Sequence, residues 1–243
     1  MESLYRIADR TIGIRSLYPD VHTLCAAYRA EGEADFTVAT TQADIDAERE
    51  KSAREDARAG VPARPFPDGY LETLAVYRAI AERMPDRDTV LVHGSCVAAD
   101  GASYLFIAKS GTGKSTHARL WRELLGERAF TVNDDKPLVR VTEGGAVAYG
   151  TPWDGKHRLS RNTAVPLRAI CILRRGNENR IEPVSAAEAY PMLLQQVYRP
   201  SDAAAMEKTL TLIDRLAAAV RLWRLTCNTD VEAARIAYDA MKG

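Results

Sequence analysis

A phosphate-binding loop is predicted at residues 108–115, which read AKSGTGKS. Its two glycines give the backbone the freedom to turn successive N–H groups toward phosphate oxygens. Lys114 is placed to reach the outer phosphates, and the Ser115 hydroxyl is an oxygen ligand of the kind Mg²⁺ takes. The predicted phosphate-binding residues are Ser110, Gly111, Thr112, Gly113, Lys114, Ser115 and Thr116. The sequence therefore predicts that the protein binds a phosphorylated ligand together with Mg²⁺.

The segments on either side of this loop fit the same prediction. A short apolar run, residues 104–107, precedes it, and residues 117–125 have helical spacing, so the order is strand, loop, helix. Ala108 stands where the general pattern has a glycine, which weakens the match mildly. The alternative is a glycine-rich turn that happens to precede a lysine. The intact core of the motif and its flanks disfavour that alternative.

Two adjacent acids, Asp134 and Asp135, follow the predicted strand 130–132, which is the first strand after the loop helix. Neighbouring side chains on an extended chain point to opposite sides. One carboxylate could then hold the metal while the other takes a proton from an attacking hydroxyl. The residues alone leave open which acid has which role. A solvated turn is the alternative without a function.

Histidine and basic residues are further candidates for the functional site. His93 ends the strand at residues 90–92 and could orient a carboxylate or tune its pKa, although an isolated histidine is more often structural. His117 is expected at the exposed start of the loop helix, with no chemical role. A small basic cluster follows Trp153 and is either a solvated loop or a clamp on nucleotide or acceptor phosphates. Its members are Lys156, Arg158 and Arg161.

Composition narrows the class of protein. The 243 residues contain 33 Lys and Arg against 33 Asp and Glu, so we expect neither nucleic acid nor a membrane as a partner. The four cysteines are far apart and form no Cys-x-x-Cys pair, which is typical of a reducing compartment. No apolar stretch approaches the ~20 residues of a membrane-spanning helix. The first residues lack the layout of a signal peptide, so we expect a cytoplasmic protein.

We expect residues 1–86 to form an N-terminal α+β lobe packed on a core of residues 87–243, or the two to be one continuous domain. Residues 42–59 are dense in charge and predict either a solvated helix or a mobile excursion, with a docking surface for a partner as the functional alternative. Hydrophobic spacing predicts the other elements of the lobe. They are strands within residues 5–16 and 36–40 and helices over residues 20–30 and 70–84.

Two β-hairpin patterns predict a mixed rather than a purely parallel sheet in the core. The first turns at Asp100–Gly101 and the second at Gly144. Beyond them we expect a strand at 167–173, then a helix that the Ser185–Glu188 capping box opens and that Pro191 kinks or shortens. An amphipathic helix at 202–218, a strand at 220–226 and a helix at 231–241 follow. The buried face of the helix at 202–218 is predicted from Met206, Leu210, Ile213 and Leu216.

The order of these motifs resembles the catalytic domain of HPr kinase/phosphorylase. The resemblance rests on His93-Gly94, on residues 110–115 and on residues 133–135, and it covers roughly residues 90–200. The chain is more distantly similar to the nucleotide site of ATP-dependent phosphoenolpyruvate carboxykinase. Residues 116–121 and 150–153 look like those of a compact branch of HPr-kinase-like proteins.

The resemblance implies an α/β fold with a mixed-sheet P-loop core, an N-terminal α+β extension and C-terminal helices. It also implies ATP and Mg²⁺ binding and phosphate transfer to a hydroxyl. Lys114 would hold the β- and γ-phosphates, Ser115 and Asp135 the metal, and Asp134 would be the general base. His93 would support the acidic pair.

The favoured hypothesis is thus an ATP- and Mg²⁺-dependent kinase whose acceptor is a hydroxyl on a metabolite, peptide or protein. A carboxykinase-like lyase and a nucleotide-binding regulatory module without turnover are the two alternatives. HPr itself is a doubtful acceptor, because the further sequence pattern for engaging that carrier is not evident. Whether the protein forms a homo-oligomer stays open.

Overall fold

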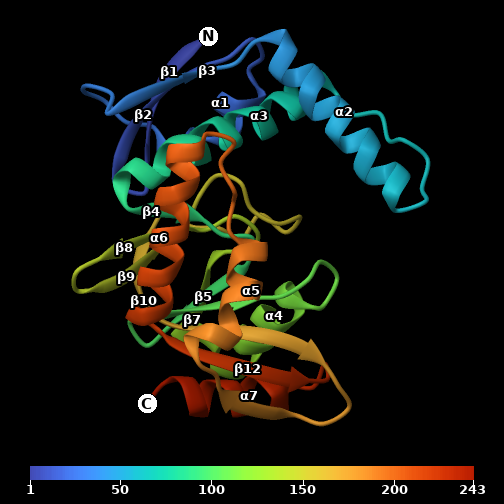
Figure 1. Ribbon diagram of the computed structural model, residues 1–243, viewed down its shortest axis with the longest axis vertical. Helices are drawn as coiled ribbons and strands as arrows, with labels where there is room; N and C mark the ends of the chain where they lie inside the picture. Colours follow the sequence, from blue (N-terminus) through green and yellow to red (C-terminus); the bar gives the residue numbers. More distant parts are fainter. The chain divides into compact units, whose positions relative to one another are not determined.

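The protein has a mixed α/β fold, as the sequence predicts. A computed structural model describes residues 1–243. The chain divides into two compact units, Met1–Glu82 and Arg83–Gly243 (Figure 1). That the N-terminal residues act as a lobe on the core stays a prediction.

The N-terminal unit combines a three-stranded sheet with helices. β1 pairs antiparallel with β2, and β2 pairs parallel with β3, which confirms the predicted strands. The predicted helix over residues 20–30 is instead two shorter helical turns. The elements are β1 (Glu2–Ile7), β2 (Arg10–Arg15), α1 (Asp20–Leu24), η1 (Ala26–Tyr28), β3 (Phe36–Ala39), α2 (Gln42–Arg58) and α3 (Asp68–Arg83).

The charged stretch after residue 41 is a regular helix, α2, rather than a mobile excursion. A capping box between Thr41 and Asp44 starts it by satisfying N–H groups of the first turn. Most of its charged side chains are exposed, whereas Ile45 is fully buried. The buried Asp56 carboxylate accepts bonds from the backbone N–H and guanidinium of Arg64, and this pairing holds the proline-containing segment after the helix.

The C-terminal unit is built on one curled, mixed sheet of nine strands. Its path runs β4-β8-β9-β10-β6-β5-β7, with β12 pairing both β10 and β11. β10 runs parallel to β6 and to β12, and the other pairings are antiparallel. The strands are β4 (Thr89–Leu91), β5 (Ser95–Ala99), β6 (Ala102–Ile107), β7 (Ala129–Asn133), β8 (Leu138–Thr142), β9 (Gly145–Tyr149), β10 (Ala164–Arg175), β11 (Arg180–Pro183) and β12 (Arg221–Cys227). Both predicted hairpins, β5–β6 and β8–β9, are confirmed.

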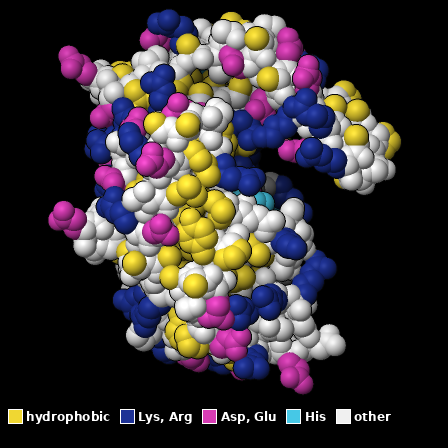
Figure 2. All heavy atoms as spheres, in the orientation of Figure 1, with side chains coloured by type: hydrophobic (Ala, Val, Ile, Leu, Met, Phe, Trp, Pro, Cys, Tyr) yellow, Lys and Arg dark blue, Asp and Glu magenta, His cyan; other side chains and the backbone are white.

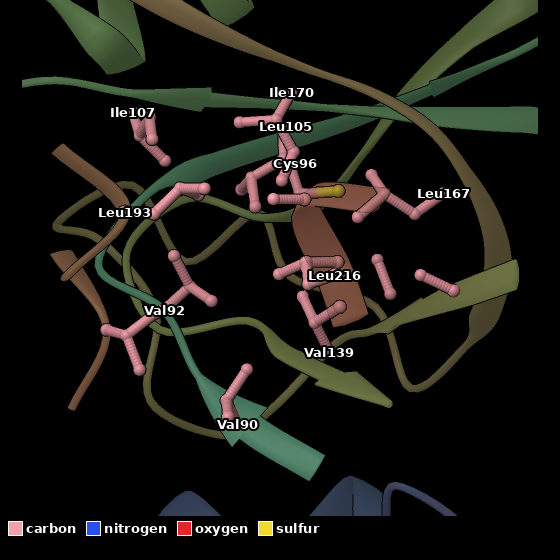
Figure 3. Close-up of a cluster of buried hydrophobic side chains, with 14 of the residues drawn as sticks. Val90, Val92, Cys96, Leu105, Ile107, Val139, Leu167, Ile170, Leu193 and Leu216 are labelled. Atoms are coloured by element: carbon pink, nitrogen blue, oxygen red, sulfur yellow. The ribbon is translucent and has the colours of Figure 1, made fainter. Parts of the chain in front are cut away.

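Helices cover both faces of this sheet, because the central strand β6 carries apolar side chains on both sides. Leu105 and Ile107 join one buried cluster with side chains of α5 and α6, and much of this cluster appears in Figure 3. Tyr104 and Phe106 point to the other face and pack with α4 and α7. This period-two alternation, with both faces apolar, makes β6 a strand buried on both sides. The helices are η2 (Met84–Arg87), α4 (Lys114–Leu125), η3 (Gly126–Arg128), α5 (Ala186–Gln196), α6 (Ala203–Ala219) and α7 (Val231–Met241).

Three details differ from the sequence-based expectation. The short strand β11 was not predicted. α5 continues past Pro191 to Gln196. Proline has no N–H, so the carbonyl of Ala187 lacks its helical hydrogen bond. Pro191 and Ala187 both lie on the exposed side of the helix, where this missing bond is tolerated. The buried face of α6 is rotated relative to the predicted one. Leu212 is buried, whereas Met206 and Leu210 are only partly buried. Small residues fill the core there, and the Thr209 hydroxyl is satisfied by the Ala205 carbonyl at 2.8 Å.

Acidic and basic side chains intermingle over the face seen in Figure 2, and hydrophobic side chains gather there over α5 and α6. No helix of the protein combines the length and the apolar character needed to cross a membrane.

Candidate functional site

The glycine-rich loop joins the end of β6 to the start of α4. Gly111 and Gly113 have φ of +75° and +118°, in the left-handed region that side chains disfavour. A Cβ at Gly111 would meet no neighbour within 4 Å, so backbone conformation rather than space requires glycine there. Gly113 caps α4, and no side chain caps the first N–H groups of this helix. The loop therefore presents backbone donors and the positive end of a helix dipole on one side.

Arg175, at the end of β10, fixes this loop from behind. Its Nε donates to the Thr112 carbonyl at 3.2 Å, and its Nη2 donates to the Gly111 carbonyl. These bonds occupy two loop carbonyls, which keeps them directed toward the guanidinium. No spacing in the sequence indicated this contact, because it joins residues more than sixty positions apart.

Lys114 is the first residue of α4 and is 9% exposed. Its Nζ donates to the Ala108 carbonyl at 3.1 Å, so the ammonium lies across the mouth of the loop. Burial lowers the pKa of this lysine, and Asp135 opposes the shift. Ala108 departs from the usual glycine, but the contact uses only its backbone.

A turn at the end of β7 places the acidic pair. Asn133 Oδ1 accepts from the backbone N–H of Asp135 at 2.9 Å and of Lys136 at 2.6 Å. This side-chain turn bends the chain directly after the strand. Asp134 and Asp135 consequently line the same cavity, in place of the opposite sides expected for an extended chain.

Asp134 is 8% exposed and is held from two directions. The Ser95 hydroxyl donates to its Oδ1 at 2.5 Å. Gly155 approaches the other oxygen so closely that a Cβ there would lie 2.9 Å from Oδ2. The carboxylate is thus fixed in one orientation, with Oδ1 already bonded.

Asp135 is set in a polar group with His93 and Lys136. Lys136 Nζ lies 2.7 Å from Asp135 Oδ2, and His93 Nε2 lies 3.4 Å from Oδ1. Burial, followed by the charges of Lys114 and Lys136, lowers the pKa of His93 to about 4, although Asp135 favours protonation. The imidazole is therefore neutral at neutral pH, and its contact with Asp135 is polar rather than ionic.

The loop and the acidic pair face one cavity of about 710 Å³, which we call the phosphate cavity. It gathers all the predicted loop residues except Thr112, together with His93 and both acids. Its lining is His93, Ser110, Gly111, Gly113, Lys114, Ser115, Thr116, Arg119, Arg122, Asp134, Asp135, Lys156, His157 and Leu159. Residues from four separate stretches of chain meet here, and these stretches are the ones whose residue types suggested chemistry.

Two arginines that line the phosphate cavity were not among the residues predicted from the sequence. Arg119 and Arg122 lie four and seven positions after Ser115, and this spacing puts all three on one face of α4. The Nε of Arg122 is buried and has no hydrogen-bond partner within the protein. Helical periodicity counted from the loop could have identified both side chains.

The three side chains of the predicted basic cluster lie in different surroundings. Lys156 lines the phosphate cavity, beside His157. The Arg158 side chain is 70% exposed and lies 3.9 Å from Asp154. Arg161 instead stacks over the Phe130 ring at 4.5 Å. Spacings of two, three and five residues in an irregular loop do not determine where side chains point, which is why the sequence could not separate these three residues.

Trp153 and His117 are both buried. Trp153, which precedes the predicted basic cluster, is a core residue with 6% exposure. His117, expected at an exposed position, is only 2% exposed. It packs edge-on against Phe106 and accepts a bond from Trp121 Nε1 at 3.1 Å. The first turn of α4 turns this side chain toward the sheet rather than toward solvent.

Comparisons with known proteins give a family and a distant structural likeness. None of the curated proteins compared with the sequence matches it. Among solved structures, the HPr(Ser) kinase/phosphatase from Coxiella burnetii is similar with a TM-score of 0.34 and 8% identity, over 63% of this chain and 99% of that one. A likeness of that size carries no argument about activity. The family model described as SynChlorMet cassette protein ScmC matches residues 70–224, which is more than half of the chain, so the protein belongs to the ScmC family.

Proposed function

We propose that this protein is an ATP- and Mg²⁺-dependent phosphotransferase that moves the γ-phosphoryl group to a hydroxyl on a metabolite, peptide or protein. One observation carries the proposal. Lys114 and Ser115, at the start of α4, share the phosphate cavity with Asp134 and Asp135, at the end of β7. A phosphate loop explains nucleotide binding, and a fixed carboxylate beside it supplies a group that can activate an acceptor.

The charge of the phosphate cavity supports a polyphosphate ligand. Four cationic side chains line it, Lys114, Arg119, Arg122 and Lys156, against two carboxylates. The start of α4 adds further positive potential. The unpartnered Nε of Arg122 is a donor that an anionic oxygen would satisfy.

The residues present fit a magnesium ion. Mg²⁺ prefers oxygen ligands and is usually held by one or two carboxylates, substrate phosphates and water. Ser115 and Asp135 provide a hydroxyl and a carboxylate in the same cavity and would hold it. When bound, the ion neutralises charge on the phosphates.

Asp134 acts as the general base in this proposal. Ser95 occupies its Oδ1, so Oδ2 is the oxygen that receives the proton of the acceptor hydroxyl. The acceptor oxygen forms a bond to the γ-phosphorus while the bond from that phosphorus to the bridging β-γ oxygen breaks, and ADP leaves. Lys114 donates to the phosphate oxygens during transfer. His93, neutral and 3.4 Å from Asp135, positions that second carboxylate.

A transfer assay tests the proposal. Purified protein is incubated with Mg²⁺ and γ-labelled ATP against pools of hydroxyl metabolites, serine-containing peptides and proteins, and labelled products are identified by mass spectrometry. We expect label on a hydroxyl in at least one pool, and none with Lys114→Met.

Lys109→Met is the matched control, because Lys109 is the other lysine of the loop but is exposed and outside the cavity lining. It should retain transfer. ATP binding without transfer to any pool would favour the regulatory module, and ATP consumption that depends on oxaloacetate would favour the lyase. Equal label with both lysine variants would overturn the proposal.

A further inference from the structure

A second cavity, of about 550 Å³, lies on the other side of the glycine-rich loop. It opens where the carboxyl ends of three neighbouring parallel strands, β6, β10 and β12, meet. In open α/β sheets, ligands bind at this edge. The lining is Thr112, Gly113, Thr116, His117, Leu120, Leu173, Arg175, Gly176, Asn177, Cys227, Asn228 and Thr229.

This cavity adjoins the phosphate cavity. Gly113 and Thr116 line both. A ligand whose phosphates lie against the loop can therefore extend its remaining part past α4 into the second cavity. Its volume is within the range of roughly 300–1,000 Å³ that small-molecule sites have.

His117 lies in the wall of the second cavity, and its ring carries one hydrogen-bond donor. Indole N–H groups can only donate, so the bond from Trp121 Nε1 requires His117 Nε2 to be unprotonated. Because Nε2 accepts that bond, the ring proton is on Nδ1. Nδ1 is buried and has no partner within the protein. The cavity wall thus contains an N–H group that lacks an acceptor.

The rest of the wall suits a flat heteroaromatic ring. Leu120 and Leu173 supply apolar surface, and Asn177 and Asn228 contribute amide groups. Purine bases combine an apolar face with ring nitrogens that accept hydrogen bonds. We propose that the second cavity holds the purine base of the nucleotide, with His117 Nδ1–H donating to a ring nitrogen. This inference rests on the proposed function, because it takes the phosphates to lie against the loop.

Binding measurements with a ligand series form the first part of the test. Affinities are measured calorimetrically with Mg²⁺ for ATP, GTP, CTP and inorganic tripolyphosphate. We expect the two purine nucleotides to bind at least about tenfold more tightly than tripolyphosphate or CTP, as for one or more added hydrogen bonds in an apolar site.

His117→Gln separates the donor from the packing. The glutamine oxygen can still accept from Trp121, whereas the donor at Nδ1 is lost. We expect ATP affinity to fall about five- to tenfold, as for one lost hydrogen bond, with tripolyphosphate affinity unchanged.

The parent protein supplies a second readout that needs no variant. Cys227 lines the second cavity and is half-buried, whereas Cys25, Cys96 and Cys171 are buried. We expect ATP and adenosine to slow alkylation of Cys227, measured by mass spectrometry, and tripolyphosphate to leave its rate unchanged.

The outcomes separate the two proposals. If tripolyphosphate binds, but ATP binds no more tightly and leaves Cys227 unprotected, the purine site is overturned and the phosphate loop stands. If no ligand of the series binds, the proposed function falls as well. Protection of Cys227 by adenosine supports the purine site even if His117→Gln fails to fold.

Discussion

The buried imidazole of His117 predicts how the stability of the protein depends on pH. Its pKa is 6.5 in an unfolded chain and about 4 in the folded protein, because burial disfavours the charged ring. Above the unfolded value both states are neutral, and the group contributes nothing. As pH falls from about 6.5 toward 4, the unfolded chain binds a proton that the folded protein does not, so stability is lost in that window.

The size of this effect follows from the two pKa values. Between about pH 8 and about pH 5, His117 alone should lower the free energy of unfolding by about 2 kcal/mol. His117→Gln cannot titrate, and its unfolding free energy should therefore fall by about 2 kcal/mol less than that of the parent over the same interval. His22 and His93, whose pKa values are also lowered by burial, are present in both proteins and cancel in the difference.

Urea unfolding followed by circular dichroism at the two pH values measures this difference. His157→Gln is the matched control, because His157 is exposed, and it should keep the pH dependence of the parent. Equal pH dependence in the parent and in His117→Gln would refute the burial of a neutral ring.

Three further predictions concern the phosphate cavity. Lys114→Met should raise the dissociation constant of Mg²⁺-ATP by about 10- to 100-fold, which is the size of a lost charge-assisted hydrogen bond. Calorimetric titration measures this change, and the circular dichroism spectrum should stay the same. An affinity equal to that of the parent protein would count against the phosphate loop. Ser115→Ala should shift the midpoint of a magnesium titration of activity more than it changes metal-free nucleotide affinity, and equal midpoints would rule out this hydroxyl as a ligand. Lys156→Ala should raise the Michaelis constant for the acceptor, because Lys156 lines the phosphate cavity. Arg158→Ala should leave this constant unchanged, because the Arg158 side chain is 70% exposed. Identical Michaelis constants in the two variants would make the loop purely structural.

Most helices and strands, and the segments that carry the candidate site residues, could be predicted because their signals are local. The loop's composition, the alternation in β6 and the turn residues of the two hairpins each lie within a few positions of sequence. Arg119 and Arg122 were also predictable from a local signal, because both have helical spacing from Ser115.

The contacts that complete the candidate site could not be predicted, because they are long-range. Arg175 reaches the glycine-rich loop from a strand far along the chain, and Ser95 bonds Asp134 across two strands. The burial of His117 depends on Phe106 and on how α4 lies on the sheet. The separation of Lys156 from Arg161 depends on the path of an irregular loop, which residue types do not determine.

In the proposed mechanism, a carboxylate fixed beside the loop activates the acceptor for phosphoryl transfer. With an acceptor identified by the transfer assay, the single-turnover rate of γ-phosphoryl transfer is compared between the parent, Asp134→Asn and Asp135→Asn. We predict that Asp134→Asn lowers the rate by about 10²- to 10⁴-fold, the range for a positioned general base, at unchanged Mg²⁺-ATP affinity. Asp135→Asn should instead raise the magnesium concentration needed for transfer. An exchange of these two effects would reassign the acids within the same mechanism, whereas parental rates in both variants would contradict it.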